Sequence, residues 1–167
     1  MNKNNIVLTG LMGAGKTTIG KALAENTGFK FVDIDAEIVK QEQMSINDIF
    51  ATKSEEYFRQ IETEIIEKIT QKNNQVISIG GGAFEKEVNR ELLLTSCKVV
   101  YLQADVDTLF ERIKTDNSRP LLQCDNPKDK LEELLKKREV NYKKAHYIID
   151  TEKKTKEDIT KEILEKI

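Results

Sequence analysis

The chain has 167 residues, a length typical of one domain, and its hydrophobic fraction of 38% is enough to build a buried core. Its 27 Lys and Arg against 29 Asp and Glu give a net charge of −2, which argues against binding nucleic acid or a membrane surface through overall charge. The single histidine excludes a histidine metal site and a Ser/His/Asp triad. With no apolar stretch long enough to span a membrane and no signal peptide at residues 1–5, we expect a cytoplasmic monomer with reduced Cys97 and Cys124.

The first predicted unit is a strand over residues 6–8, a glycine-rich loop and a helix that ends at Gly28. The loop, residues 10–17 (GLMGAGKT), matches G-x-x-x-x-G-K-[ST] at every fixed position. Glycines let the backbone N–H groups approach phosphate oxygens, and the helix N-terminus adds further amides. Lys16 is placed to contact the β/γ-phosphates, and the Thr17 hydroxyl to ligate Mg²⁺. The alternative is an ordinary glycine-rich turn before a helix.

A second strand is predicted over residues 29–32, followed by Asp33 and Asp35. Carboxylates at the carboxyl end of a parallel strand lie on the ligand side of an α/β sheet. The two-residue period of a strand predicts that both point to the same side, one toward a water of the Mg²⁺ shell and the other toward a phosphate acceptor. Alternatively, one of them caps the helix expected over residues 36–41.

A capping-box-like sequence at Ser45 predicts a short helix, and a longer amphipathic helix follows it. The apolar stripe of that helix consists of Phe58, Ile61, Ile65, Ile66 and Ile69. Arg59 lies beside the stripe near the start of the helix, where the helix dipole does not favour a cation. From its own surroundings in the sequence, Arg59 is read as a surface residue.

A third strand over residues 75–79 ends in Gly80, Gly81 and Gly82. Three successive glycines after a buried strand indicate either a very close approach of the backbone to something else or a sharp turn. Because a plain turn needs only one or two glycines, the approach of a ligand is favoured.

The rest of the chain continues the alternation of strands and helices. Helices are predicted over residues 88–94, from about 106, from 127 and over 153–167, and strands over 99–102 and 147–149. Residues 115–127 lack a pattern, which is typical of a lid or a disordered segment. Asn126 and Pro127 suit the N-cap and first position of the next helix.

Five successive strand–helix units predict a single α/β domain, residues 1–167: a P-loop three-layer sandwich with a five-stranded parallel sheet flanked by helices. The glycine loop, the two aspartates and the three glycines then meet at the carboxyl edge of the sheet. This convergence indicates a small phosphoryl-transfer enzyme.

Taken together, the motifs resemble the shikimate kinase family over residues 5–150. The segments that carry the resemblance are residues 10–20, 33–35, 58–62 (FRQIE), 80–83 (GGGA), 119–122 (RPLL) and Lys137-Arg138 followed by Tyr142. The glycine loop alone indicates only nucleotide binding, whereas the joint order and spacing of the segments are specific.

The resemblance implies ATP-dependent phosphorylation of the 3-hydroxyl of shikimate, with ATP and shikimate as partners and one Mg²⁺ as cofactor. Its catalytic residues are Lys16, Asp35 and Arg119, its magnesium residues are Thr17 and, through water, Asp33, and its shikimate-binding residues are Asp35, Arg59, Gly81 and Arg138. The ATP-binding residues are Gly13, Ala14, Gly15, Lys16, Thr17, Thr18, Arg112, which stacks on adenine, and the lid arginine Arg119. Residues of about 34–60 form the acceptor-binding insertion and residues of about 115–127 the lid.

Two questions stay open at this stage. Asp35 either orients the acceptor hydroxyl or takes its proton. The family often has a proline near the adenine after the last strand, but residues 150–155 (DTEKKT) contain none, so the adenine contacts of that loop are undetermined. The alternative functions are another small-molecule or nucleoside-monophosphate kinase and a non-catalytic nucleotide-binding module.

Overall fold

A computed structural model of the chain describes residues 4–115 and 124–167. The strands are β1 (Ile6–Thr9), β2 (Lys30–Asp33), β3 (Gln75–Ser78), β4 (Lys98–Gln103) and β5 (Tyr147–Asp150). The helices of the described part are α1 (Lys16–Thr27), α2 (Ile34–Glu42), α3 (Ile46–Thr52), α4 (Glu55–Thr70), α5 (Glu87–Ser96), α6 (Val106–Ile113), α7 (Pro127–Tyr142) and α8 (Lys156–Lys166), with a 3-10 turn η1 (Ala83–Glu85). Most of the expected lid, including Arg119, lies outside the described residues.

The five strands form one parallel sheet in the order β2-β3-β1-β4-β5, which confirms the predicted fold class. β1 is the central strand, and Ile6 lies opposite Val76 of β3 on one side and Lys98 of β4 on the other. The chain crosses from one side of β1 to the other between β3 and β4. The carboxyl end of β1 therefore lies at the switch point of the sheet, where ligands bind in open α/β folds.

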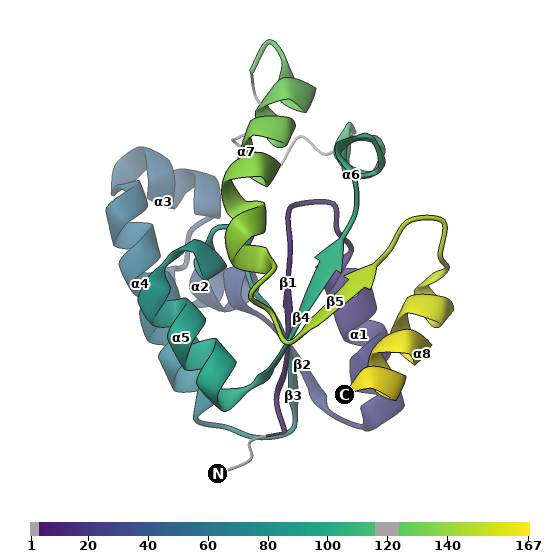
Figure 1. Cartoon of the computed structure of the whole chain (residues 1–167). Helices are drawn as coiled ribbons and strands as arrows, with labels where there is room; N and C mark the ends of the chain where they lie inside the picture. Colours follow the sequence, from purple (N-terminus) through teal and green to yellow (C-terminus); the bar gives the residue numbers. More distant parts are fainter. Residues whose placement is uncertain (1–3, 116–123) are drawn as a thin grey trace.

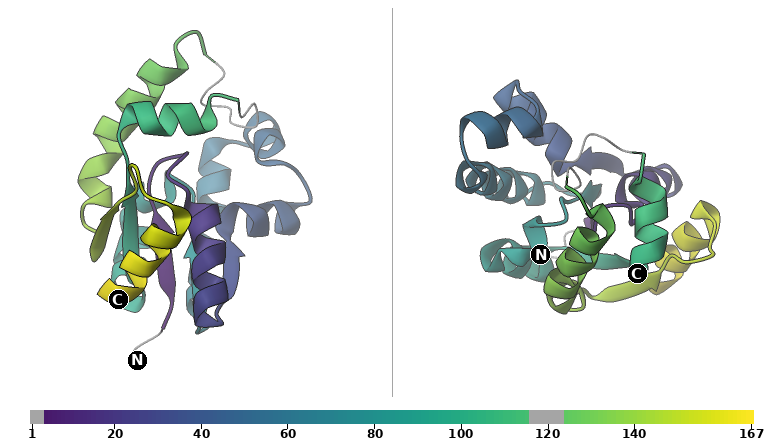
Figure 2. Two further views of the ribbon diagram at one scale, coloured as in Figure 1. Left: turned by 90° about the vertical axis from the view of Figure 1, so that its right-hand side faces the viewer. Right: turned by 90° about the horizontal axis from the view of Figure 1, so that it is seen from above.

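Helices cover both faces of the sheet. In Figure 1, α1 and α8 lie together on one side and α4 and α5 on the other, and α6 and the start of α7 stand above the carboxyl ends of the strands. The two further views in Figure 2 show the same layers from the side and from above. Buried aliphatic side chains of β1, β3 and β4 fill both interfaces, and the stripe of α4 predicted from the sequence is buried throughout.

The boundary between β2 and α2 differs from the prediction. β2 ends at Asp33, whose Oδ1 accepts a hydrogen bond from the backbone N–H of Ala36 (3.1 Å), so Asp33 is the N-cap of a helix that already begins at Ile34. Asp35 consequently lies in the first turn of α2 and not on a strand. The expectation that a strand period aligns the two aspartates is wrong, and the alternative of an N-cap is correct for Asp33.

The serines that precede α3 and α4 act as N-caps. The hydroxyl of Ser45 accepts from the N–H of Asp48 and that of Ser54 from the N–H of Tyr57, at 3.1 and 3.0 Å. Asn126 occupies the predicted N-cap position of α7 with Pro127 after it, but its side chain makes no capping bond to the described residues.

Across the described residues, no helix combines the length and apolarity that crossing a membrane requires.

Candidate active site

The glycine loop between β1 and α1 has a backbone that only glycine tolerates at its turns. Gly13 and Gly15 have φ angles of 83° and 92°. A β-carbon on Gly13 would also lie 2.8 Å from the carbonyl oxygen of Leu109, so α6 packs directly against the loop. Gly15 is the N-cap of α1, and no described side chain caps it, which leaves the first amides of the helix to bind an anion.

The loop brings three of the predicted residues to the start of α1. Nζ of Lys16 donates to the carbonyl oxygens of Gly10 (2.7 Å) and Leu11 (3.1 Å), so the ammonium group lies against the loop. The Thr17 hydroxyl donates to Oδ2 of Asp33 at 3.3 Å. Of the other predicted loop residues, Ala14 is buried and Thr18 is exposed on the first turn of α1.

Thr17 and Asp33 fit the magnesium ion that the sequence predicts. A hydroxyl and a carboxylate within hydrogen-bond distance of each other supply the hard oxygen ligands that Mg²⁺ prefers. No group of three or more His, Cys, Asp or Glu among residues 4–115 and 124–167 could hold a metal.

The three glycines after β3 provide room for other side chains. None of them is among the glycines with positive φ, which are Gly10, Gly13, Gly15 and Gly28. A β-carbon on Gly80 would lie 3.2 Å from Oδ1 of Asp35 and 3.2 Å from Oε1 of Glu62. Residues 80–83 form a turn, in which the N–H of Ala83 donates to the carbonyl oxygen of Gly80 at 3.0 Å, but this turn does not need a positive φ at its glycines. What the glycines provide here is room for side chains that approach the backbone closely.

Arg59 meets this segment from α4. A β-carbon on Gly82 would lie 2.8 Å from Cζ of Arg59, and Nη1 of Arg59 donates to Oε2 of Glu62 at 2.8 Å. Glu62 is fully buried, and its Oε1 accepts no hydrogen bond from the described residues. Burial raises the pKa of Glu62, and the neighbouring Arg59 partly offsets this effect. The reading of Arg59 as a surface residue is wrong: its side chain is only 25% exposed.

Arg138 and Tyr142 reach the same segment from α7. A β-carbon on Gly81 would lie 3.2 Å from Nη1 of Arg138 and 3.5 Å from the carbonyl oxygen of Gly10, which places Gly81 beside the phosphate loop. The Tyr142 hydroxyl donates to the carbonyl oxygen of Gly81. Burial raises the pKa of Tyr142, so its phenol stays protonated and remains a donor.

Arg112 stands apart from this group, at the end of α6. Its Nη1 donates to the carbonyl oxygen of Gly13 and to the hydroxyl of Thr151, and its Nη2 donates to the carbonyl oxygen of Thr151, each at 3.2 Å. The guanidinium group therefore joins the phosphate loop to the loop after β5.

The structure brings the predicted residues together in two adjoining groups. Lys16, Thr17 and Asp33 surround the phosphate loop, whereas Asp35, Arg59 and Arg138 surround residues 80–82. Three residues with contacts in this region have no role predicted from the sequence: Glu62, Tyr142 and Thr151. Glu62 had a signal, because it is a carboxylate within the apolar stripe of α4, three residues after Arg59. Thr151 had none, because its partner is distant in the chain.

Comparison with known proteins identifies the family. A family model described as shikimate kinase matches residues 12–167. The chain belongs to the shikimate kinase family. Members of this family are kinases, so the chain is a phosphotransferase, as its sequence predicted. The shikimate kinase of Thermodesulfovibrio yellowstonii is 44% identical over 96% of this chain and 92% of its own. That of Persephonella marina is 44% identical over 98% of each chain.

Solved structures give the same result. A shikimate kinase from Acinetobacter baumannii, in complex with shikimate, matches with a TM-score of 0.94 and 41% identity, over 98% of this chain and 92% of its own. A shikimate kinase from Aquifex aeolicus matches with a TM-score of 0.86 and 35% identity, over 97% and 95%. A gluconokinase from Sinorhizobium meliloti, with a TM-score of 0.61 and 20% identity over 98% and 90%, shares the fold.

Proposed function

We propose that this chain transfers the γ-phosphoryl group of ATP to the 3-hydroxyl of shikimate across the boundary between the phosphate loop and residues 80–82. The observation that carries the proposal is the convergence of Arg59, Arg138 and Asp35 on three glycines next to Gly10. Two cations and a carboxylate beside a phosphate loop suit an acceptor that has both a carboxylate and hydroxyl groups. The names of the relatives support shikimate as that acceptor.

The phosphates of ATP bind to the amides of residues 13–18 and to Lys16. When the nucleotide binds, the ammonium group of Lys16 leaves the carbonyl oxygens of Gly10 and Leu11 and contacts phosphate oxygens instead. The Thr17 hydroxyl would hold magnesium directly and Asp33 would hold it through water; the hydroxyl and Oδ2 of Asp33 lie 3.3 Å apart. Magnesium, when bound, neutralises the charge on the phosphate oxygens. The fixed backbone amides act on the same charge without reorganisation.

The acceptor binds over residues 80–82. The guanidinium groups of Arg59 and Arg138 bind the shikimate carboxylate, because planar forks match a carboxylate in two parallel hydrogen bonds. The carboxylate of Asp35 accepts a hydrogen bond from the reacting hydroxyl, and orients it or takes its proton. The backbone of Gly81, whose carbonyl oxygen accepts a hydrogen bond from Tyr142, forms the rest of the acceptor site. In-line positioning of this kind supplies much of the catalysis of phosphoryl transfer.

The remaining assignments complete the proposal. The faces of the Arg112 guanidinium stack on adenine, residues of about 34–60 form the acceptor-binding insertion, and residues of about 115–127 form a lid that carries Arg119 over the transferred phosphate. The enzyme works in the cytoplasm as a monomer.

The test is the release of ADP with a panel of acceptors: shikimate, gluconate, CMP and AMP. We expect turnover with shikimate alone. CMP and AMP have no carboxylate, and gluconate has its carboxylate and hydroxyl groups on a flexible open chain and not in the fixed arrangement of a ring. A Lys16→Met variant that stays folded should lose most of its kcat, since a preorganised charge typically contributes about 3–4 kcal/mol to the transition state. Turnover of gluconate or a nucleotide in preference to shikimate would overturn the assignment.

A further inference from the structure

The loop between β5 and α8 is fixed through Thr151. This residue is fully buried, and both its backbone N–H and its hydroxyl donate to the carbonyl oxygen of Gln103, at 2.9 and 3.0 Å. Oδ1 of Asp150 accepts from the N–H of Glu152 at 2.8 Å and shapes the turn that follows. Thr151 is thus held to the end of β4 by two bonds, and its position does not depend on Arg112.

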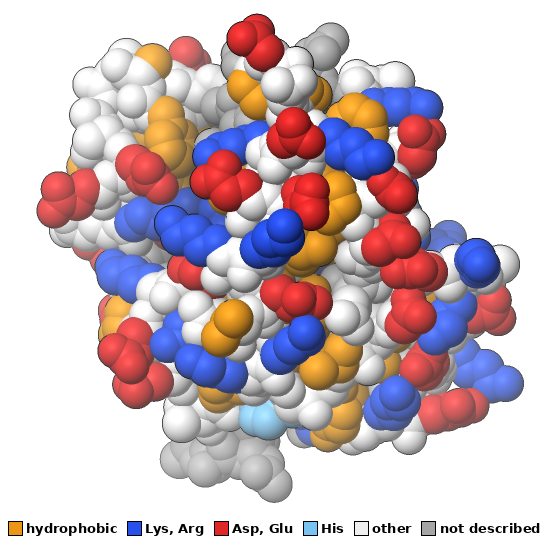
Figure 3. Space-filling view, turned by 45° about the horizontal axis from the view of Figure 1, so that its top comes forward, with side chains coloured by type: hydrophobic (Ala, Val, Ile, Leu, Met, Phe, Trp, Pro, Cys, Tyr) orange, Lys and Arg blue, Asp and Glu red, His pale blue; other side chains and the backbone are white. Residues whose placement is uncertain are grey.

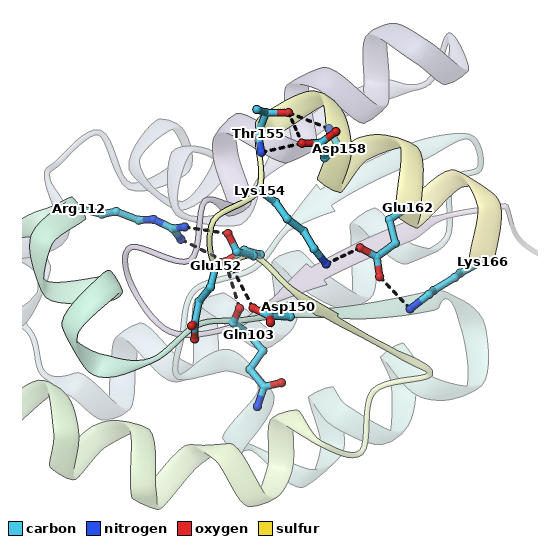
Figure 4. A network of polar contacts seen from close by, with 10 residues as sticks. Gln103, Arg112, Asp150, Glu152, Lys154, Thr155, Asp158, Glu162 and Lys166 are labelled. Atoms are coloured by element: carbon cyan, nitrogen blue, oxygen red, sulfur yellow. Dashed lines mark hydrogen bonds and ion pairs between the residues drawn. The ribbon is translucent and has the colours of Figure 1, made fainter.

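Arg112 is an exposed residue whose guanidinium group is nevertheless held in place. Thr151 accepts from it twice, through its hydroxyl and its carbonyl oxygen, and Gly13 accepts a third bond. All N–H donors of a guanidinium group lie in its plane, so these bonds occupy its edge and leave its faces for stacking. Figure 4 shows Arg112 reaching from α6 to this loop, beside Glu152 and Gln103.

The same loop also holds the other end of α6. Oε1 of Glu152 accepts from the backbone N–H of Asp105 at 2.9 Å, and Asp105 is the N-cap of α6, with Oδ1 accepting from Thr108 at 2.7 Å. Two neighbouring residues of one loop therefore hold the first and the last turn of α6. The orientation of Arg112 depends on this loop and not on α6 alone.

We propose that Thr151 is a positioning residue for the nucleotide base: through its hydroxyl it fixes the plane of the Arg112 guanidinium on which the base stacks. The inference rests on the proposed role of Arg112 in binding adenine and adds the residue that orients it. It also explains how the loop after β5, which has no proline at residues 150–155, contributes to binding the base. The phosphate and acceptor groups have no contact with the Thr151 hydroxyl, so its removal weakens only the interaction with the base.

The test compares Thr151→Val, which removes the hydroxyl at nearly constant shape, with Thr151→Ser, which keeps it. Thr160→Val is the matched control, because Thr160 is also buried and its hydroxyl donates to Lys156 within α8 (2.8 Å). Calorimetry measures the binding of Mg·ADP and of magnesium tripolyphosphate, which has the phosphates but no base. Steady-state kinetics give KM for ATP, KM for shikimate and kcat.

We expect Thr151→Val to bind ADP roughly three- to tenfold more weakly, the effect of one lost hydrogen bond, and to raise KM for ATP by the same factor. Binding of tripolyphosphate, KM for shikimate and kcat at saturating ATP should stay unchanged, and Thr151→Ser and Thr160→Val should resemble the wild type. Equal losses for ADP and tripolyphosphate would show a merely structural role and overturn the inference.

An Arg112→Ala variant separates the two levels of the proposal. If it binds ADP as tightly as the wild type, Arg112 does not contact the base. Both the proposed role of Arg112 and the inference about Thr151 are then wrong. If Arg112→Ala weakens ADP but Thr151→Val does not, the proposed function stands and the inference alone is wrong.

Discussion

Arg59 and Arg138 reach residues 80–82 with different degrees of constraint. Arg138 is 9% exposed and lies against Gly81, whereas the Arg59 side chain is 25% exposed and is held by the buried carboxylate of Glu62. A guanidinium group that is already fixed loses little freedom when it binds a carboxylate. Both arginines are therefore prepared for an anion before it arrives.

Lysine substitutions test the geometry of these two residues while keeping their charge. We expect Arg59→Lys and Arg138→Lys each to weaken shikimate binding by about 1–3 kcal/mol, the range of a hydrogen bond to a charged group. ATP affinity measured without acceptor should not change, because neither residue contacts the phosphate loop. Calorimetric titration of each variant with shikimate and with Mg·ADP gives both values. Equal weakening of the two ligands would contradict the placement of the acceptor.

We expect shikimate binding to depend on pH through Glu62. Burial raises its pKa above the ordinary value of 4.5, so Glu62 takes up a proton at a higher pH than an exposed glutamate does. Once neutral, it no longer forms an ion pair with Arg59. We expect the affinity for shikimate to fall as the pH is lowered through the raised pKa of Glu62.

A Glu62→Gln variant provides the comparison. The amide is neutral at every pH, so the variant should bind shikimate weakly throughout and lack the part of the pH dependence that Glu62 contributes. Titrations of both proteins over the same pH range measure the difference. Identical pH profiles would show that the protonation of Glu62 does not control Arg59.

At the scale of single residues, the sequence predicted which residues gather at the site better than it predicted what surrounds each of them. The motif at residues 10–17 predicted that Lys16 and Thr17 lie where the loop enters a helix, but their bonds to Gly10, Leu11 and Asp33 were not predicted. The placement of Asp35 was wrong, because a strand period was continued past the N-cap at Asp33. The environment of Arg59 was missed because it depends on Gly82, which is distant in the sequence.

At the scale of the elements, a polar cluster joins three helices: Glu42 at the end of α2, Lys53 directly after α3 and Tyr57 in the first turn of α4. Oε2 of Glu42 accepts from Nζ of Lys53 at 2.7 Å and from the Tyr57 hydroxyl at 2.8 Å, and Nζ of Lys53 lies 4.1 Å from the centre of the Tyr57 ring. The hydrogen bond from Lys53, followed by that from Tyr57, lowers the pKa of Glu42. The cluster joins the end of α2 to the start of α4, the two helices that carry Asp35 and Arg59.

The lowered pKa of Glu42 predicts how the stability contributed by this cluster varies with pH. Because the folded-state pKa lies below the ordinary value of 4.5, the contribution is fully present above pH 4.5 and is lost as the pH falls through the lowered pKa. Glu42→Gln should therefore lower the Tm at neutral pH and have little effect in strong acid. Thermal unfolding at both pH values measures this, with Glu67→Gln at an exposed position of α4 as the control. A Tm difference that is the same at both pH values would contradict the expectation.

The helices and strands were predictable where apolar residues recur at a regular spacing in the sequence. The stripe of α4 and the apolar runs of the five strands are explained by burial on one or two faces, and their limits differ from the prediction by a few residues. The attachment of α6 to the loop after β5 was not predictable. It consists of polar contacts between Arg112 and Thr151, 39 positions apart, and no periodicity marks such a pair.

At the scale of the whole molecule, β1 unites the core with the site. Leu8 is fully buried in the centre of the sheet, and its carbonyl oxygen accepts from the N–H of Ile79, just before the three glycines. In Figure 3, acidic and basic side chains are intermixed over the visible face, as the net charge of −2 suggests. We therefore expect packing on the central strand to contribute more to stability than the exposed charges, because exposed ion pairs contribute little.

Leu8→Ala should lower the free energy of unfolding by about 2–5 kcal/mol, because it leaves a cavity in a well-packed core. Urea unfolding followed by circular dichroism measures the change. Val140→Ala, at a side chain that is 67% exposed, is the control and should have little effect. A loss of similar size in both variants would show that the packing around Leu8 is not a main source of stability.

The central place of β1 also has a consequence for the order in which the protein is made. Residue 6 leaves the ribosome well before its partners, residues 76 and 98, so neither edge of β1 can pair until those later segments have been synthesised. Such distant pairings make folding slow. Until then, the nascent chain presents an apolar strand with two open edges, which is a target for chaperones and a site of aggregation. The strand that supports the phosphate loop is thus synthesised before both of its neighbours, and it gains one with β3 and the other only with β4.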